Sequence, residues 1–238
     1  MDLARASFSI SFTILLDNYN SVSLRIFITG GTGYLGRRLI ARLLKSGHEV
    51  KALTRKESVD KLPQGCIPII GDPFDANAFA SSIDEGSTFI QLLGVSHPGP
   101  AKKHLFDKID FASAAASITA ATKTSCSHFI YVSVAQTPTS IMHDYQQCRA
   151  RCEKLLDKSL LKASIIRPWY VVGPGHYWPL LFLPLFKLLE IIPATSDKAK
   201  ALRLVYLPQM LATLHYAVNH PPQSRQVFEV ADIRNLKA

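Results

Sequence analysis

The chain has 238 residues, of which 47% are hydrophobic and 19% charged, a balance that excludes a disordered, collagen-like or coiled-coil protein. Lys and Arg number 27 against 18 Asp and Glu, so the formal net charge is +9. This excess favours an anionic partner (nucleic acid, an anionic membrane surface or a phosphate-rich cofactor) without choosing among the three.

Residues 1–22 precede the first predicted strand. Their apolar run, residues 8–16, is interrupted by Ser and Thr, and the polar segment that follows lacks the small residues of a signal-peptidase site. We interpret the segment as a dispensable N-terminal extension, with a cryptic targeting segment as the alternative.

Apolar runs separated by Gly, Pro and polar residues then alternate between strand and helix patterns. The predicted strands are residues 24–29, 49–53, 67–70, 87–93, 128–132, 163–167 and 226–230. The predicted helices are residues 37–46, 76–83, 102–123, 144–158 and 207–219. Because the two alternate, we expect an α/β fold, a Rossmann-type doubly wound parallel sheet with right-handed crossovers. Residues 23–238 are expected to form one domain that includes a small C-terminal lobe at about 173–238.

A glycine-rich turn follows the first predicted strand. Residues 30–36 read Gly-Gly-Thr-Gly-Tyr-Leu-Gly and lead into an amphipathic helix. In this context glycine lets the backbone approach a pyrophosphate, and the helix N-terminus offers unpaired N–H groups to it. A tight turn without a ligand is the alternative. The residues predicted to contact a dinucleotide here are Gly30, Thr32, Gly33, Tyr34, Leu35 and Gly36.

The end of the second predicted strand indicates which dinucleotide is bound. NAD binders carry an acid there for the ribose 2′-hydroxyl. This chain has Leu53-Thr54-Arg55-Lys56, with no acid before Glu57. Because Arg55 offers a planar fork of donors to a 2′-phosphate, NADP(H) is favoured over NAD(H). A solvated basic loop is the alternative.

Several motifs together resemble the atypical or extended short-chain dehydrogenase/reductases, including NAD(P)H-binding and NAD-dependent epimerase/dehydratase-like proteins. The resemblance is carried by residues 29–36, Gly71-Asp72, Tyr131-Val132-Ser133-Val134, Arg167-Pro168 and Gly173-Pro174-Gly175. It implies that Asp72 contacts the adenine and that Gly94 lies against the cofactor. It also implies that Ser133 and Pro168 lie beside the nicotinamide. A turn role for Asp72, and packing roles for Gly94 and Ser133, are the alternatives.

The family transfers protons with a Tyr-x-x-x-Lys pair, in which the lysine lowers the tyrosine pKa and holds the nicotinamide ribose. The matching segment is Tyr145-Gln146-Gln147-Cys148-Arg149, so the resemblance implies that Tyr145 carries the proton and Arg149 holds the ribose. Arginine keeps the positive charge but has a bulkier, planar head. Ala135 stands where the family usually has a hydroxyl residue, which removes one donor to a substrate carbonyl. A packing role is the alternative for Tyr145.

Other polar residues and the cysteines suggest further interpretations. His97, Lys103 and His176 are placed in loops that follow predicted strands, where ligands bind in open α/β sheets; catalysis and local hydrogen bonding both remain open for the histidines. The four cysteines show neither a secreted disulfide pattern nor metal-ligand spacing. We therefore predict reduced thiols, no metal site and a cytoplasmic protein.

The apolar stretch 178–193 has three interpretations: a packed helix, a lid over an apolar substrate, or a patch for peripheral contact with a membrane or a partner subunit. No uncharged apolar run reaches the roughly 18 residues of a membrane-spanning helix. The basic residues are scattered and no recognition motif is present, so nucleic-acid binding is not expected. The oligomeric state is not indicated.

These features favour an NADP(H)-binding oxidoreductase or epimerase-like protein that acts on a small, apolar or sugar-derived substrate. In that interpretation residues 173–238 include the substrate lobe. The alternative is a non-catalytic NAD(P)H-binding sensor or assembly protein, which the missing lysine and hydroxyl support.

Overall fold

The computed structural model describes residues 23–140, 142–184 and 192–236 of the chain. Within them, a parallel sheet of seven strands has the order β3-β2-β1-β4-β5-β6-β9. The strands are β1 (Arg25–Thr29), β2 (Glu49–Thr54), β3 (Ile67–Ile70), β4 (Thr88–Gln91), β5 (His128–Val132), β6 (Ala163–Ile166) and β9 (Arg225–Phe228). The predicted Rossmann-type α/β fold is therefore confirmed.

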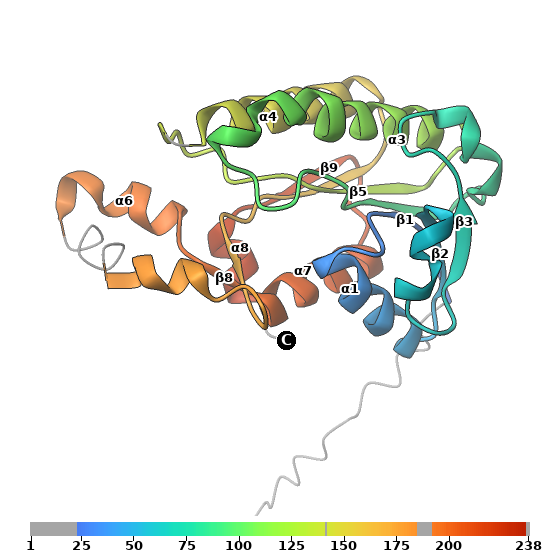
Figure 1. The fold of residues 1–238 in the computed structure, drawn as a ribbon, viewed down its shortest axis with the longest axis horizontal. Helices are drawn as coiled ribbons and strands as arrows, with labels where there is room; N and C mark the ends of the chain where they lie inside the picture. The colour runs from blue at the N-terminus through green and yellow to red at the C-terminus, as the bar shows by residue number, and fades with distance from the viewer. Residues whose placement is uncertain (1–22, 141, 185–191, 237–238) are drawn as a thin grey trace, which may run out of the picture.

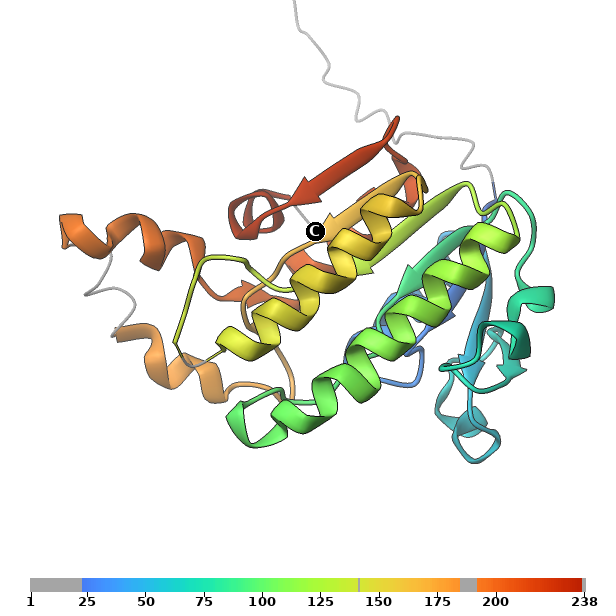
Figure 2. The same cartoon turned by 90° about the horizontal axis from the view of Figure 1, so that it is seen from above.

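Helices cover both faces of this sheet and give the molecule three layers (Figure 1). α3 (Ala112–Lys123) and α4 (His143–Lys158) lie side by side over one face, as the view from above shows (Figure 2). α1 (Tyr34–Lys45), α7 (Leu207–Asn219) and α8 (Val230–Asn235) lie under the other face. Each face encloses its own apolar cluster, because strands buried on both sides present branched and aromatic residues to both helix layers.

The predicted helix at 76–83 is wrong. Two single 3₁₀ turns replace it, η2 (Ala76–Ala78) and η3 (Ala80–Ser82). Between them Phe79 has φ −139° and ψ −6°, outside the α-helical region, and its side chain is completely buried. The ring stacks on Phe27 of β1 with 5.9 Å between centroids. Burial of this ring against the sheet thus outweighs the helical propensity of the alanines around it.

The predicted helix at 102–123 is interrupted. The chain passes through η4 (Pro100–Lys102), α2 (Lys103–Leu105) and a π-helical segment, η5 (Phe106–Phe111), before α3 begins. A π-helical turn holds more residues than an α-helical turn, so it changes which side chains face the core. Here it turns Phe106 and Asp110 inward.

The C-terminal part of the described chain adds an edge strand to the sheet, a helix beneath it and a separate pair of short strands. α7 packs under the sheet and β9 extends it beside β6. A separate parallel pair, β7 (Val171–Val172) with β8 (Val205–Tyr206), and the helix α6 (Pro193–Ala201) were not predicted. A short helical segment, η6 (Trp178–Phe182), lies at the start of the stretch for which a packed helix was one interpretation. The interpretations of residues 1–22 lie outside the described residues, and those of 178–193 lie partly outside them, at 185–191.

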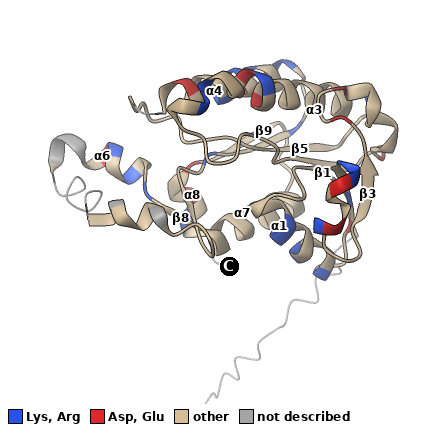
Figure 3. Ribbon diagram, in the orientation of Figure 1, with Lys and Arg blue, Asp and Glu red and all other residues tan. Residues whose placement is uncertain are grey.

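Charged side chains are spread over the molecule. Figure 3 shows Lys and Arg on α1, α4 and α6, with Asp and Glu interleaved among them on α4. The expectation that nucleic acid is not a partner stays a prediction. None of the helices that the structure describes combines the length and apolar character needed to cross a bilayer.

Candidate functional site

A cavity of about 920 Å³ opens at the carboxyl ends of the first four strands. The loops that follow β1, β2, β3 and β4 form its walls. Parallel α/β sheets bind ligands at this edge, where the loops diverge to either side. Of the predicted cofactor residues, the cavity is lined by Gly30, Thr32, Arg55, Asp72 and Gly94.

In the turn between β1 and α1, the glycine positions leave little or no room for a Cβ. Gly30 has φ +77°, and a Cβ there would lie 2.7 Å from the Leu93 backbone nitrogen. A Cβ on Gly36 would lie 2.8 Å from the Gly31 Cα. Gly33 caps α1 with its backbone alone, and no acidic side chain lies in the first turn. The turn therefore brings bare backbone and an uncompensated helix N-terminus to the cavity, an arrangement suited to a pyrophosphate.

Arg55 and Asp72 line the part of this cavity formed by the loops after β2 and β3. Arg55 follows β2, and its largely exposed side chain pairs with Glu57 at 3.3 Å. Asp72 follows β3, and its Oδ1 accepts a 2.9 Å hydrogen bond from the Phe74 amide. Asp72 thus forms the turn that the alternative interpretation described, and it also lines the cavity.

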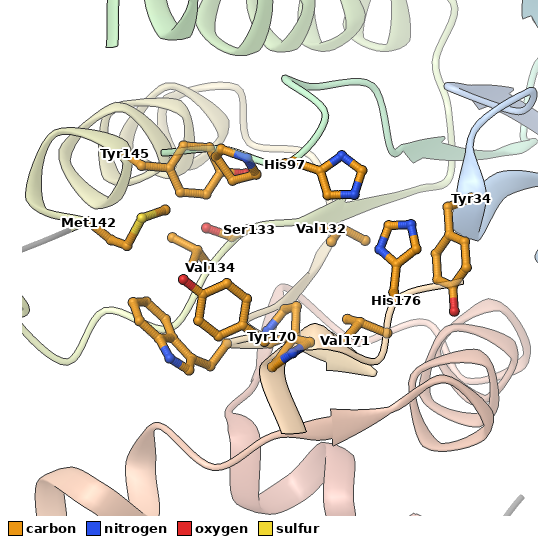
Figure 4. Close-up of a pocket in the computed structure, with 14 residues that line it drawn as sticks. Tyr34, His97, Val132, Ser133, Val134, Met142, Tyr145, Tyr170, Val171 and His176 are labelled. Carbon is orange, nitrogen blue, oxygen red and sulfur yellow. The ribbon is translucent and has the colours of Figure 1, made fainter. Parts of the chain in front are cut away.

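A second cavity of about 230 Å³ lies beyond β4, at the ends of β5 and β6 (Figure 4). Its walls are mainly apolar and aromatic, and its polar groups converge from several loops. Among the predicted residues it is lined by Tyr34, His97, Ser133, Tyr145, Pro168 and His176. The structure therefore brings together residues that lie more than a hundred positions apart in sequence.

Three rings, one from the start of α1 and two from loops, stack along one side of this second cavity. Tyr34 of the glycine turn stacks on His176 with 4.1 Å between centroids, and His176 stacks on His97 at 4.7 Å. Figure 4 shows the three rings in a row. Arg38 lies over the outer face of Tyr34, 4.3 Å from its centroid. Burial, together with the charges of His97 and Arg38, lowers the pKa of His176.

Tyr145 and Arg149 lie one turn apart on α4, and both are buried. The Arg149 Nε donates to the Tyr145 hydroxyl at 3.0 Å. Burial raises the pKa of Tyr145, and the nearby guanidinium opposes that rise. Lys103, by contrast, points to the surface and pairs with Asp144 at 3.0 Å, so it is not part of this cluster.

The remaining donors of Arg149 are also engaged by the protein. Nη1 donates to the Tyr131 hydroxyl at 3.0 Å and to the Val132 carbonyl at 3.2 Å. Nη2 pairs with Asp110 Oδ1 at 2.6 Å. That Arg149 holds the ribose stays a prediction; the contacts in the structure show it fixing Tyr145, β5 and η5 to one another.

Sequence reasoning missed two buried carboxylates, Asp110 and Glu153. Neither belongs to a motif, and each sits on a helical segment where the pattern suggests a surface position. One signal was available. Arg149 stands where the family has a lysine, and a buried arginine requires an acid nearby. Which acid it is depends on the packing of η5 against α4.

A family model described as NAD(P)H-binding matches residues 30–174. This region includes the glycine turn and both Tyr145 and Arg149. A 4-hydroxy-2-methyl-3-oxo-4-farnesyl-3,4-dihydroquinoline-1-oxide ketoreductase from Stigmatella aurantiaca is 46% identical over 50 residues. That match covers 20% of this chain and only 15% of the relative.

Solved structures of similar fold contain nicotinamide dinucleotides. Bordetella bronchiseptica WbmH in complex with NAD+ aligns with a TM-score of 0.66 and 19% identity, over 87% of this chain and 76% of that one. MoeE5 in complex with UDP-glucose and NAD aligns with a TM-score of 0.66 and 16% identity, over 88% of this chain and 79% of that one. At these identities the likeness is one of fold.

Proposed function

The chain belongs to the NAD(P)H-binding family, among the extended or atypical short-chain dehydrogenase/reductases, and we propose that it is an NADP(H)-dependent oxidoreductase acting on a small, apolar or sugar-derived carbonyl compound. One observation carries the proposal. The glycine-turn cavity lies at the ends of β1 to β4, and a smaller cavity that Tyr145 lines lies at the ends of β5 and β6, which continue the same sheet. The first suits a dinucleotide and the second suits the substrate.

The residues of the larger cavity fit a dinucleotide. The glycines present backbone without side chains, and α1 begins beside this cavity with no acidic residue in its first turn. Arg55 supports NADP(H) over NAD(H), because a planar guanidinium at this wall suits a 2′-phosphate. In the structure the Arg55 guanidinium pairs with Glu57 at 3.3 Å, so a bound 2′-phosphate would take the place of that carboxylate. When bound, NADPH supplies a hydride to the substrate carbonyl carbon.

In the proposed reaction Tyr145 supplies the proton. The phenol passes it to the carbonyl oxygen as negative charge develops there, and the product is an alcohol. Arg149, 3.0 Å from the phenol oxygen, stabilises the phenolate that remains until solvent restores the proton. Apolar walls around the second cavity limit competing water and favour an apolar substrate surface.

The test compares wild-type protein with Tyr145→Phe in NADPH oxidation over a panel of aldehydes, ketones and keto sugars. Loss of the Tyr145 hydroxyl is expected to lower turnover at least about 100-fold. The affinity for NADPH, measured by calorimetry, should stay unchanged. Tyr216→Phe is the matched control, since Tyr216 lies on α7 and lines neither cavity. Wild-type turnover in Tyr145→Phe would remove Tyr145 from the mechanism.

The second candidate is a non-catalytic dinucleotide sensor or assembly protein. The observation that favours it is the engagement of Arg149 with Tyr131, Val132, Tyr145 and Asp110, which directs its donors into the protein. Ala135 also leaves the hydroxyl position empty. Tight NADPH binding with no turnover on any panel member, together with a partner recovered only when NADPH is present, would favour this function.

A further inference from the structure

We infer that Asp110 is a positioning residue that, with Arg149, forms a buried ion pair replacing the family lysine and setting the acid strength of Tyr145. The inference rests on the proposed function, because it concerns the proton donor of that reaction. It adds a residue from η5, a segment that no motif includes.

The pair is enclosed by protein. The side chains of Arg149 and Asp110 are 7% and 0% exposed, and Nη2 lies 2.6 Å from Oδ1. A lone guanidinium in such surroundings is strongly disfavoured, so a partner carboxylate is required if arginine is to stand at this position. Asp110 is the acid that the structure pairs with it.

Asp110 reaches this place because the chain is π-helical there. η5 turns the carboxylate toward α4, while the neighbouring Asp107 stays on the surface and pairs with Arg151 at 2.7 Å. The second oxygen of Asp110 accepts a hydrogen bond from the Val95 amide at 3.2 Å. One side chain therefore joins α4 to the loop that follows β4.

Gly94 separates the ion pair from the larger cavity. It lines that cavity, and a Cβ on it would lie 2.6 Å from Asp110 Oδ1 and against the Arg149 guanidinium. Only a residue without a side chain leaves space for the pair here. The pair consequently lies directly beneath the backbone predicted to contact the cofactor, with the phenol at its other end.

Two charges of opposite sign act on the phenol. Burial raises the pKa of Tyr145; Arg149 lowers it and Asp110 raises it. An arginine without a paired carboxylate would lower the Tyr145 pKa further than the ion pair does. The carboxylate offsets part of that effect. The titratable groups around the phenol are Arg149 and Cys148 from α4, Asp110 from η5, Tyr131 from β5 and His97 across the cavity.

The experiment measures the phenol itself. Tyrosine ionisation is titrated by ultraviolet absorbance in the full chain, as the difference between each protein and the same protein carrying Tyr145→Phe. In Asp110→Asn we expect the Tyr145 transition to move down by about one pH unit, a tenfold change in acid strength. In a plot of turnover against pH, the fall in turnover at high pH should also begin at a lower pH in Asp110→Asn.

Asp107→Asn is the matched control, because it makes the same change three residues away at an exposed ion pair. It should leave the transition in place. The double variant Asp110→Asn/Arg149→Gln removes both charges. It leaves no unpaired buried cation, so it serves if Asp110→Asn alone does not fold. Its Tyr145 should ionise at a higher pH than the Tyr145 of Asp110→Asn.

Identical transitions in wild type, Asp110→Asn and the double variant would overturn the inference. The titration does not need turnover, so its result is separable from that of the proposed function. Absence of NADPH oxidation in the wild type contradicts the oxidoreductase proposal alone, whereas an unmoved transition contradicts the role of Asp110 alone.

Discussion

Ser133, at the end of β5, donates a 2.6 Å hydrogen bond to the buried carboxylate of Glu153 on α4. The same carboxylate receives Arg167 from the end of β6 and Arg225 from β9. Ser133 lines the smaller cavity, yet its hydroxyl is directed at the protein. Its role beside the nicotinamide stays a prediction. The hydrogen bond to Glu153 fixes this part of the cavity wall to α4.

Glu153→Gln is expected to destabilise the fold by about 2 kcal/mol, because it takes a charge from a buried cluster. The loss falls below that of an isolated buried pair, since Arg167 still pairs with Glu229 and Arg225 with Asp157. The free energy of unfolding in urea measures it. Glu85→Gln, at an exposed position, should change stability little. Equal stability of Glu153→Gln and wild type would show that the cluster contributes nothing net.

Gly36→Ala should weaken NADPH binding at least about tenfold and lower stability by about 1–3 kcal/mol. The added Cβ would press on the Gly30 carbonyl oxygen and lie 2.8 Å from the Gly31 Cα, so the turn must shift. Calorimetry with NADPH and thermal unfolding report the two effects. Gly99→Ala is the control, since a Cβ there meets nothing within 4 Å. Undiminished affinity in Gly36→Ala would count against the glycine turn as the pyrophosphate site.

Arg55→Ala should reduce NADPH affinity about tenfold while leaving NADH affinity unchanged, because only NADPH carries the 2′-phosphate that the guanidinium would bind. Dissociation constants for both dinucleotides are compared by calorimetry. Lys56→Ala is the matched control: Lys56 is the next residue and carries the same positive charge, but it does not line the cavity. Parallel losses for both dinucleotides would assign Arg55 a role other than selecting the phosphate.

Because His128 is buried, we expect the free energy of unfolding to depend on pH. Burial, with the charge of Lys162, lowers its pKa to about 4, and its Nε2 lies 3.0 Å from the Ser164 hydroxyl. Between its ordinary pKa near 6.5 and this value, the unfolded chain binds a proton that the folded chain does not. Stability should therefore hold above pH 6.5 and fall by about 3 kcal/mol toward pH 4.

Unfolding in urea at several pH values checks this dependence. His128→Gln removes the group and should flatten the decline, whatever its effect on stability at neutral pH. His104→Gln, at an exposed position on α2, should retain the wild-type slope. A slope that His128→Gln leaves unaltered would mean that other groups cause the acid sensitivity.

The sequence by itself determined the order of strands and helices and the position of the glycine turn. These features depend on local chemistry: apolar runs must be buried on both faces of a parallel sheet, and residues 30–36 leave the backbone bare before a helix. It also placed Tyr145 and Arg149 on one face of a helix, since four residues make about one turn.

Tertiary structure alone decided what Arg149 contacts, where the segment before α3 becomes π-helical, and which loops bring His97, His176 and Tyr34 together. Propensity suggested a helix at 76–83, but the burial of Phe79 prevented it. The physical reason is the same in each case. Pairing of buried charges and packing of rings depend on residues far apart in the chain, so periodicity and spacing along the sequence contain no information about which of them meet.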